Sequence, residues 1–137
     1  MNQLDKLNHL KNIIKQVPHE RFDLDLWRTI PGTDNMTFAQ LINSDANCCV
    51  IGWATADETF KRLNFMMLDG VPLYAPFRAN TGEPFTYEEL KTNVVYRGSE
   101  AVREFFGLNY EDVDHIIFES NYAFEDPIKD EIIDHIN

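Results

Sequence analysis

Two adjacent cysteines, Cys48 and Cys49, are the side chains of this sequence most suited to nucleophilic chemistry. They precede the apolar run 50–56, so we expect them at the start of a short buried helix capped by Asp45 or Asn47. A helix N-terminus favours a thiolate, and a nearby histidine would make Cys49 a nucleophile. No cysteine-protease signature surrounds the pair, and free cysteines are commonly small buried hydrophobic residues. The buried interpretation is therefore favoured over the catalytic one.

A second pattern could hold a metal ion. The segment Glu-x-x-Asp-His-Ile occurs at 111–116 and again at 131–136. On a helix, the glutamate and the histidine of each copy lie one turn apart, where they could offer a carboxylate and an imidazole to one metal. The candidate ligands are Glu111, His115, Glu131 and His135. The simpler interpretation places the isoleucines in the core of an acidic region, and we expect no metal and no other cofactor.

Acidic residues are concentrated in the C-terminal part of the chain, which has a net charge of −11 overall. Residues 1–68 carry seven basic and eight acidic side chains, whereas residues 100–137 carry two basic and eleven acidic ones. Such a surface repels phosphate backbones and anionic lipids, so we expect neither direct nucleic-acid binding nor membrane binding. A protein with a basic surface is the complementary partner. The alternative is a solvated face that maintains solubility.

The residues that would form this acidic binding face are Glu111, Asp112, Asp114, Glu119, Glu125, Asp126 and Asp130. Motifs for other chemistry are absent: there is no glycine-rich phosphate loop, Gly-x-Ser-x-Gly, His-Glu-x-x-His, Cys-x-x-Cys or calcium loop. The sequence also has no long apolar run or signal-peptide pattern. We therefore expect a cytoplasmic protein with free thiols.

Helical spacing of apolar residues recurs along the chain and indicates a mainly α fold. Residues 2–17 have this spacing and end at Pro18, and Thr86 with Glu89 has the spacing of a capping box. Pro127 suits the first turn of a last helix. We predict a single domain over residues 1–137, a compact bundle of about six or seven short helices with room for one small two-stranded hairpin.

Residues 71–86 interrupt the helical pattern. Four Pro and Gly residues stand there among aromatic side chains, which predicts an irregular loop or a short hairpin within the domain. The aromatic side chains could form a recognition patch or fold back over the core.

Glycines beside large aromatic residues mark the predicted structural core. Gly52 would let another helix approach the backbone while Trp53 fills the adjoining volume. Gly107 follows Phe105 and Phe106, as a glycine that ends a helix does. The predicted core residues are Cys49, Gly52, Trp53, Phe105 and Gly107.

Three blocks occur in order: 49–54 (Cys-Val-Ile-Gly-Trp-Ala), 101–108 (Ala-x-x-Glu-Phe-Phe-Gly-Leu) and 113–118 (Val-x-x-Ile-Ile-Phe). Together they resemble a loose group of small uncharacterised proteins from bacteriophages and bacteria. That group carries a Cys-Ile-x-Gly-Trp-Ala block followed by an Ala-x-x-Leu-Gly-Leu helix, and Phe106 stands where leucine is usual. The resemblance implies a helical domain of phage or mobile-element type, and it implies no activity.

The functional hypothesis is a small acidic accessory protein that binds another protein through its C-terminal face. By analogy with small acidic phage proteins, the partner would be a basic nucleic-acid-handling host or defence protein that this binding inhibits. The alternative is a small enzyme that uses Cys49 with a histidine, or a metal held by the two Glu-x-x-Asp-His segments. A third possibility is a subunit of a larger assembly that makes contact through residues 71–87.

Overall fold

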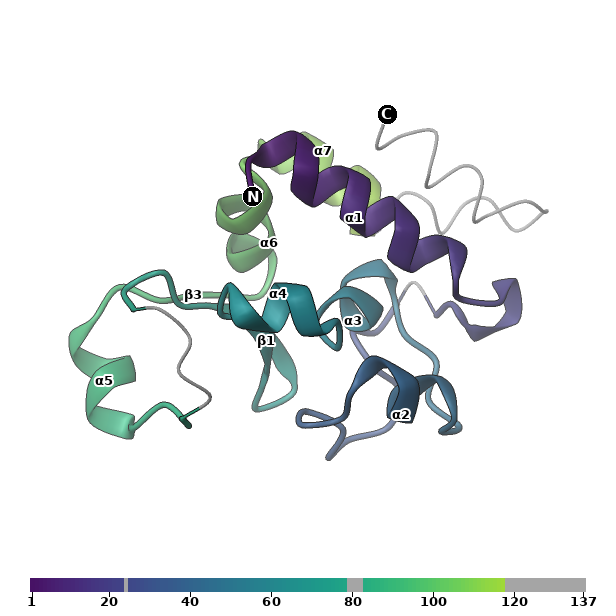
Figure 1. The fold of residues 1–137 in the computed structure, drawn as a ribbon, viewed down its shortest axis with the longest axis horizontal. Coiled ribbons are helices and arrows are strands. Elements are labelled where there is room, and N and C mark those ends of the chain that lie inside the picture. The colour runs from purple at the N-terminus through teal and green to yellow at the C-terminus, as the bar shows by residue number, and fades with distance from the viewer. Residues whose placement is uncertain (24, 79–82, 118–137) are drawn as a thin grey trace.

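A three-stranded antiparallel sheet lies among short helices, so the prediction of a mainly helical bundle is wrong. The computed structural model describes residues 1–23, 25–78 and 83–117 (Figure 1). The last helix predicted from Pro127 lies outside these residues. In chain order the helices are α1 (Gln3–Lys15), the 3₁₀ turn η1 (His19–Arg21), α2 (Phe38–Ile42), α3 (Val50–Ala54), α4 (Glu58–Arg62), α5 (Tyr87–Thr92), α6 (Ser99–Phe106) and α7 (Tyr110–Ile117), and the strands are β1 (Phe65–Leu68), β2 (Val71–Tyr74) and β3 (Tyr96–Arg97).

The sheet has the order β1-β2-β3, with both pairs antiparallel. The two-residue connection from β1 to β2 has positive φ at Asp69 and at Gly70, which is the geometry of a type I′ hairpin turn. Pro72 lies opposite Met67 and directs its carbonyl to the N–H of Gly98 at 2.8 Å. At that position the missing N–H of proline costs no hydrogen bond between β1 and β2.

The sheet was not predicted for two reasons. Proline in a short apolar run is typical of a loop, and the apolar residues of β1 continue the helical spacing of α4. Residues 71–74, which we placed in the irregular segment, are strand β2. Figure 1 shows α5 at one end of the molecule, away from α1 and α6. It contains no buried residue, although Thr86 and Glu89 do form the predicted capping box.

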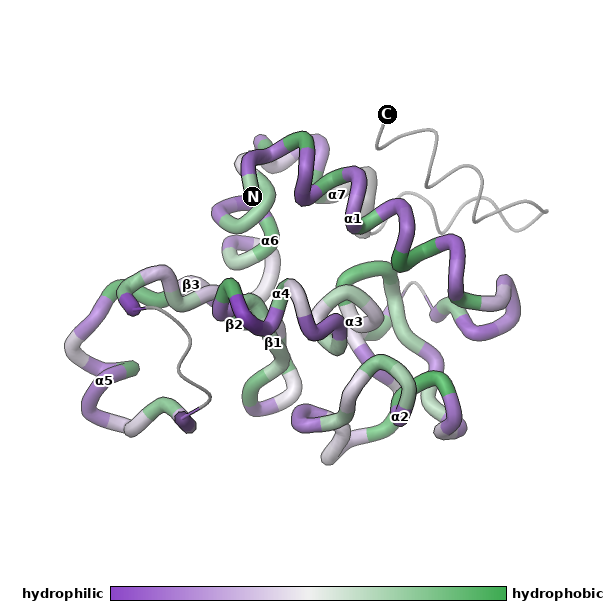
Figure 2. Tube along the Cα trace, in the orientation of Figure 1, coloured by the Kyte–Doolittle hydropathy of each residue, from purple (hydrophilic) through white to green (hydrophobic). Residues whose placement is uncertain are grey.

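The core joins α1, α3, α4, α6 and the sheet. Leu10, Ile13 and Ile14 are the buried face of α1, and Figure 2 shows hydrophobic and hydrophilic residues alternating along this helix. Four phenylalanines form the aromatic centre of the core, where Phe65 stacks on Phe105 with ring centroids 4.2 Å apart; the four are Phe60, Phe65, Phe105 and Phe106. This burial, rather than the helical propensity of such short elements, stabilises them.

Candidate functional site

The cysteine pair lies in the interior, at the entrance of α3. Cys49 is itself the N-cap residue of α3, so neither Asp45 nor Asn47 caps this helix. The backbone of Cys48 is joined to the end of η1 and to the residues after it: its N–H donates to the carbonyl of Arg21 at 3.1 Å, and its carbonyl accepts from the N–H of Asp23 at 3.0 Å. Both side chains are buried and both thiols are free.

Burial makes these thiols weak acids. It raises the pKa of Cys48 to about 12, although the nearby charge of Arg28 opposes this shift. It raises the pKa of Cys49 to about 11, against the lowering effect of backbone N–H groups at the start of α3. Because nucleophilic attack requires the thiolate, protonated and buried thiols disfavour the catalytic interpretation of Cys49.

Gly52 permits an unusually close approach of two chain segments. A Cβ atom at this position would lie 1.7 Å from the carbonyl oxygen of Trp27 and 2.7 Å from the Cβ of Cys48. The approaching segment is the irregular stretch before Arg28, and not the second helix that the sequence suggested. Trp53 is fully buried beside it, with the ring of Phe38 5.9 Å away.

Two arginines that sequence reasoning missed hold this region together. Arg21 donates to the backbone carbonyls of Ile42 at 2.7 Å, Ser44 at 2.9 Å and Ala46 at 2.6 Å, and it stacks over Trp53 at 5.3 Å. The carbonyl groups at the end of α2 and just after it have no partner within the helix. The side chain of Arg21 supplies their hydrogen bonds.

Arg28 bonds in the same way to the carbonyls of Gly52 at 3.1 Å and of Thr33, and to the hydroxyl of Thr55 at 3.2 Å. Burial lowers its pKa. In the sequence each arginine has one aromatic neighbour, Phe22 or Trp27, and this does not reveal backbone carbonyls as the partners of Arg21 and Arg28.

A histidine–aspartate pair joins α1 to the start of α4. The Nε2 atom of His9 lies 2.7 Å from Oδ2 of Asp57, and the same oxygen accepts from the N–H of Phe60 at 3.1 Å. The imidazole also packs edge-on against the Phe60 ring, with centroids 4.9 Å apart. Asp57 thus caps α4 and anchors α1, and these contacts give the pair a structural role.

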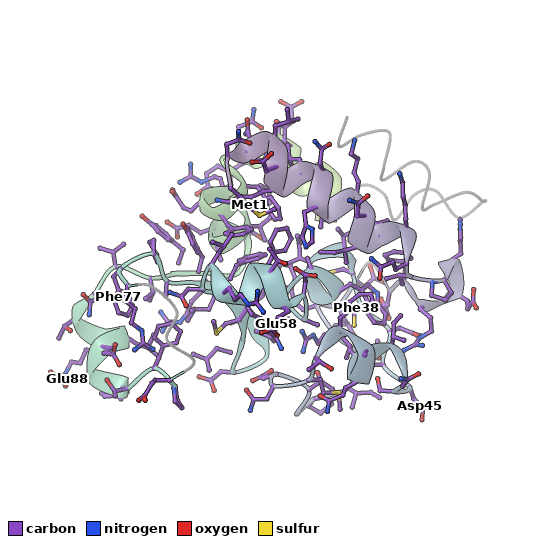
Figure 3. The ribbon with its side chains drawn as sticks, in the orientation of Figure 1. Met1, Phe38, Asp45, Glu58, Phe77 and Glu88 are labelled. Atoms are coloured by element: carbon purple, nitrogen blue, oxygen red, sulfur yellow. The ribbon has the colours of Figure 1, made fainter. Side chains whose placement is uncertain are left out.

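Asp57 also lines a cavity of about 360 Å³ between α1, α2 and α4. Figure 3 labels two other residues that line it, Phe38 and Glu58, which begin α2 and α4. Neither the two cysteines nor His9 line this cavity, so it is not a site shared by the candidate nucleophile and a histidine.

The proposed acidic face and the metal candidates are described only in part. Glu111 is exposed and Asp112 is half-buried in the first turn of α7, where the Asn109 side chain accepts from the N–H of Asp112 at 2.8 Å. Asp114 and His115 belong to α7, but their side chains are not described. Six residues lie outside the described part of the chain: four of the acidic face (Glu119, Glu125, Asp126 and Asp130) and the two candidate metal ligands of the second segment (Glu131 and His135). Within residues 1–23, 25–78 and 83–117, no three His, Cys, Asp or Glu residues gather as metal ligands.

Four of the five predicted core residues are buried, and one is not. Cys49, Trp53 and Phe105 are at most 1% exposed, and Gly52 is buried. Gly107 is exposed, which corrects its assignment to the core; it ends α6 in the left-handed conformation at φ +68°. Its role is therefore to terminate a helix, which glycine does without steric cost.

No helix in the described part of the chain is long and apolar enough to cross a membrane. Comparisons of the chain with known protein families, with curated proteins and with solved structures find no match.

Proposed function

We propose that this protein acts by binding another protein that has a basic surface, through the acidic face that begins on α7. The single observation that carries the proposal is the charge asymmetry of the sequence. Residues 100–137 hold eleven acidic and two basic side chains, whereas residues 1–68 are close to neutral. Clustered charge of one sign raises the rate of encounter with an oppositely charged partner and repels nucleic acid.

The described part of the face has the exposure that such binding needs. Glu111 is exposed and Asp112 is half-buried; Glu100, which is not a residue of the face but belongs to the same acidic part of the chain, is exposed at the start of α6. Tyr110, immediately before Glu111, has 58% of its surface exposed and lies under the guanidinium of Arg103 at 4.7 Å. An exposed tyrosine beside acidic side chains supports a protein partner, because tyrosine is enriched at protein interfaces.

The properties of the thiols also favour binding over catalysis. The pKa values of Cys48 and Cys49 are raised to about 12 and about 11, so neither supplies a thiolate at neutral pH. By analogy with small acidic phage proteins, the target we propose is a host or defence protein that handles nucleic acid, which this chain would inhibit by covering its basic surface.

The test uses three forms of the protein as bait for lysate proteins: wild type, a face variant (Glu111→Gln, Asp112→Asn, Asp114→Asn) and a control variant. The control, Glu20→Gln with Asp45→Asn and Glu88→Gln, removes the same charge from exposed positions outside the face. We expect a basic protein to be captured by wild type and by the control at low salt, and to be lost at high salt because screening weakens exposed charge pairs.

The face variant should capture much less of that protein, by about tenfold or more if the charges contribute about 1.4 kcal/mol together. Equal capture by all three forms, or capture that is independent of salt, would contradict the proposal. Circular dichroism of each variant shows whether the fold is retained.

A further inference from the structure

A cavity of about 430 Å³ opens between the start of α1, the end of α4 and β2. Its lining residues are Met1, Lys6, Arg62, Leu63, Asn64, Tyr74, Pro76 and Arg78. Three of these side chains are basic, and no described residue that lines the cavity is acidic. The cavity beside α2 is lined by Asp57 and Glu58, and a third, near β1, by Glu58 and Glu83. The protein has a net charge of −11, so a cavity whose charged lining residues are all basic is unexpected.

Lys6 is a partly desolvated cation at this cavity. Its Nζ atom donates to the carbonyl of Phe105 at 2.8 Å and lies 4.3 Å from the centroid of the Phe105 ring. Burial lowers the pKa of Lys6. An ammonium group has three N–H donors, so the bond to Phe105 leaves donors for a ligand. Figure 3 labels Met1, another residue of the cavity lining, next to α6.

Arg78 and Asn64 bring polar groups that are buried and incompletely bonded. The Nδ2 atom of Asn64 donates to the carbonyl of Arg78 at 2.6 Å, while Oδ1 of Asn64 and Nε of Arg78 are buried without a partner among the described residues. Asn64 is only 2% exposed and has a positive φ of 61°. Unpaired buried polar atoms are unfavourable, so a bound group that pairs with them would be stabilised.

The remaining basic groups retain capacity for an anion. Arg78 pairs with Glu89 at 3.2 Å through Nη1 and donates to the carbonyl of Glu83 at 2.9 Å through Nη2. Arg62 is exposed and has only a weak contact with Glu58, at 3.8 Å. Neither glutamate that pairs with these arginines lines this cavity. The described residues therefore place an excess of positive charge there.

From this arrangement we propose that the cavity formed by Lys6, Arg62, Asn64, Tyr74 and Arg78 is a binding site for a phosphate group that carries a proton. Hydrogen phosphate has two negative charges to match the cations, and arginine recognises phosphate oxygens through its planar fork. Its one P–OH group is a donor for the unpaired Oδ1 of Asn64. Sulfate has the same shape and charge but no such donor at neutral pH, so the site should prefer phosphate.

This site is independent of the acidic face, since none of its residues belongs to that face. The test is titration calorimetry of the full chain with inorganic phosphate at pH 7 and constant ionic strength, followed by the same titration with sulfate and with glycerol phosphate. We expect saturable binding of one phosphate per chain and weaker binding of sulfate. Glycerol phosphate is mainly a dianion without a P–OH group at pH 7, so it should also bind more weakly than inorganic phosphate; tighter binding of glycerol phosphate would contradict the hydrogen bond to Asn64.

The variants are Arg62→Gln, Lys6→Gln and Arg78→Gln, with Lys15→Gln as the control on the exposed distal end of α1. Loss of a charged partner should weaken phosphate binding by about tenfold or more, and the control should change it by less than about twofold. Arg62 is the decisive position, because its side chain is exposed and we expect its substitution to leave the fold intact. Absence of saturable phosphate binding, equal binding of sulfate, or equal weakening by Lys15→Gln would overturn the proposal.

Discussion

At the scale of single residues, the interior contains two arginine guanidinium groups that water would solvate in the unfolded chain. In the folded protein, backbone carbonyl groups accept their hydrogen bonds in place of water. Arg21 and Arg28 each donate hydrogen bonds to several backbone carbonyl groups. Each arginine satisfies several acceptors at once because its donors form a fixed fork. The thiols beside them respond differently to burial: they remain neutral, and the consequence is a dependence of stability on pH.

We predict that the free energy of unfolding decreases as pH rises above about 8.5, where a thiol of the unfolded chain ionises. The folded protein holds the protons of Cys49 and Cys48 to pH about 11 and about 12. Above the unfolded pKa, ionisation therefore favours the unfolded chain, by up to about 1.4 kcal/mol per thiol per pH unit. Below that pH both states are protonated, and the thiols contribute no pH dependence.

Urea unfolding at pH 7, 9 and 10 measures this slope, and Cys49→Ala supplies the comparison. The variant should lose less stability between pH 7 and 10 than wild type does, whatever its stability at pH 7. Identical slopes would contradict the assignment of raised pKa values to the thiols.

At pH 7 an aromatic disulfide reagent should react with the two thiols only after the protein unfolds. In the native protein the thiols are protonated and the reagent cannot reach them.

At the scale of elements, α3 has five residues and depends on its surroundings for its existence. All five are buried, and the helix is packed against both α1 and the segment around Trp27. Gly52 allows the backbone of α3 to lie directly against the backbone at Trp27. The position of α3 therefore depends on the absence of a side chain at Gly52 as well as on the apolar residues around it.

We predict that Gly52→Ala destabilises the fold by about 3 kcal/mol or more, because the Cβ would overlap the backbone carbonyl of Trp27. Backbone cannot move aside as a flexible side chain can. Denaturant unfolding measures the change, and Ala39→Ser on the exposed surface of α2 is the control, with an expected change within about 0.5 kcal/mol. A loss below about 1 kcal/mol in Gly52→Ala would show that the two segments do not pack this closely.

At the scale of the whole molecule, charge is distributed unevenly over a mixed helix and sheet fold. The chain has 23 acidic and 12 basic residues, and most of the excess acid lies after residue 100. Like charges repel each other, and folding of the described residues brings their charges closer than they are in the unfolded chain. The same charge that would attract a basic partner therefore lowers the stability of the protein without one.

We predict that the midpoint of thermal unfolding at pH 7 rises when ionic strength increases from 0.01 M to 0.15 M, because the screening length falls from about 30 Å to about 8 Å. A gain of about 1 kcal/mol would raise the midpoint by about 4 °C in a domain of this size. Sodium chloride and potassium chloride should act equally, in a buffer without phosphate. A midpoint that falls or stays constant would show that net repulsion does not limit stability.

Local signals in the sequence were sufficient for several elements. The spacing of Leu7, Leu10, Ile13 and Ile14 predicted α1, the pair Thr86 and Glu89 predicted the start of α5, and Gly107 marked the end of α6. These features depend on contacts within one or two helical turns, so they can be read from neighbouring residues. The sequence alone also determined the acidic character of residues 100–137, which no fold can change.

The tertiary structure decided which distant residues meet, and with that the sheet and the sites. Pro72 lies in β2 opposite Met67 and accepts a hydrogen bond from Gly98, and the sequence does not show these partners. Likewise, Gly52 meets the carbonyl of Trp27, His9 meets Asp57, and Lys6 shares a cavity with Arg78 across 72 positions of the chain. Such contacts depend on burial and on chain path over long separations, and neither leaves a periodic pattern in the sequence.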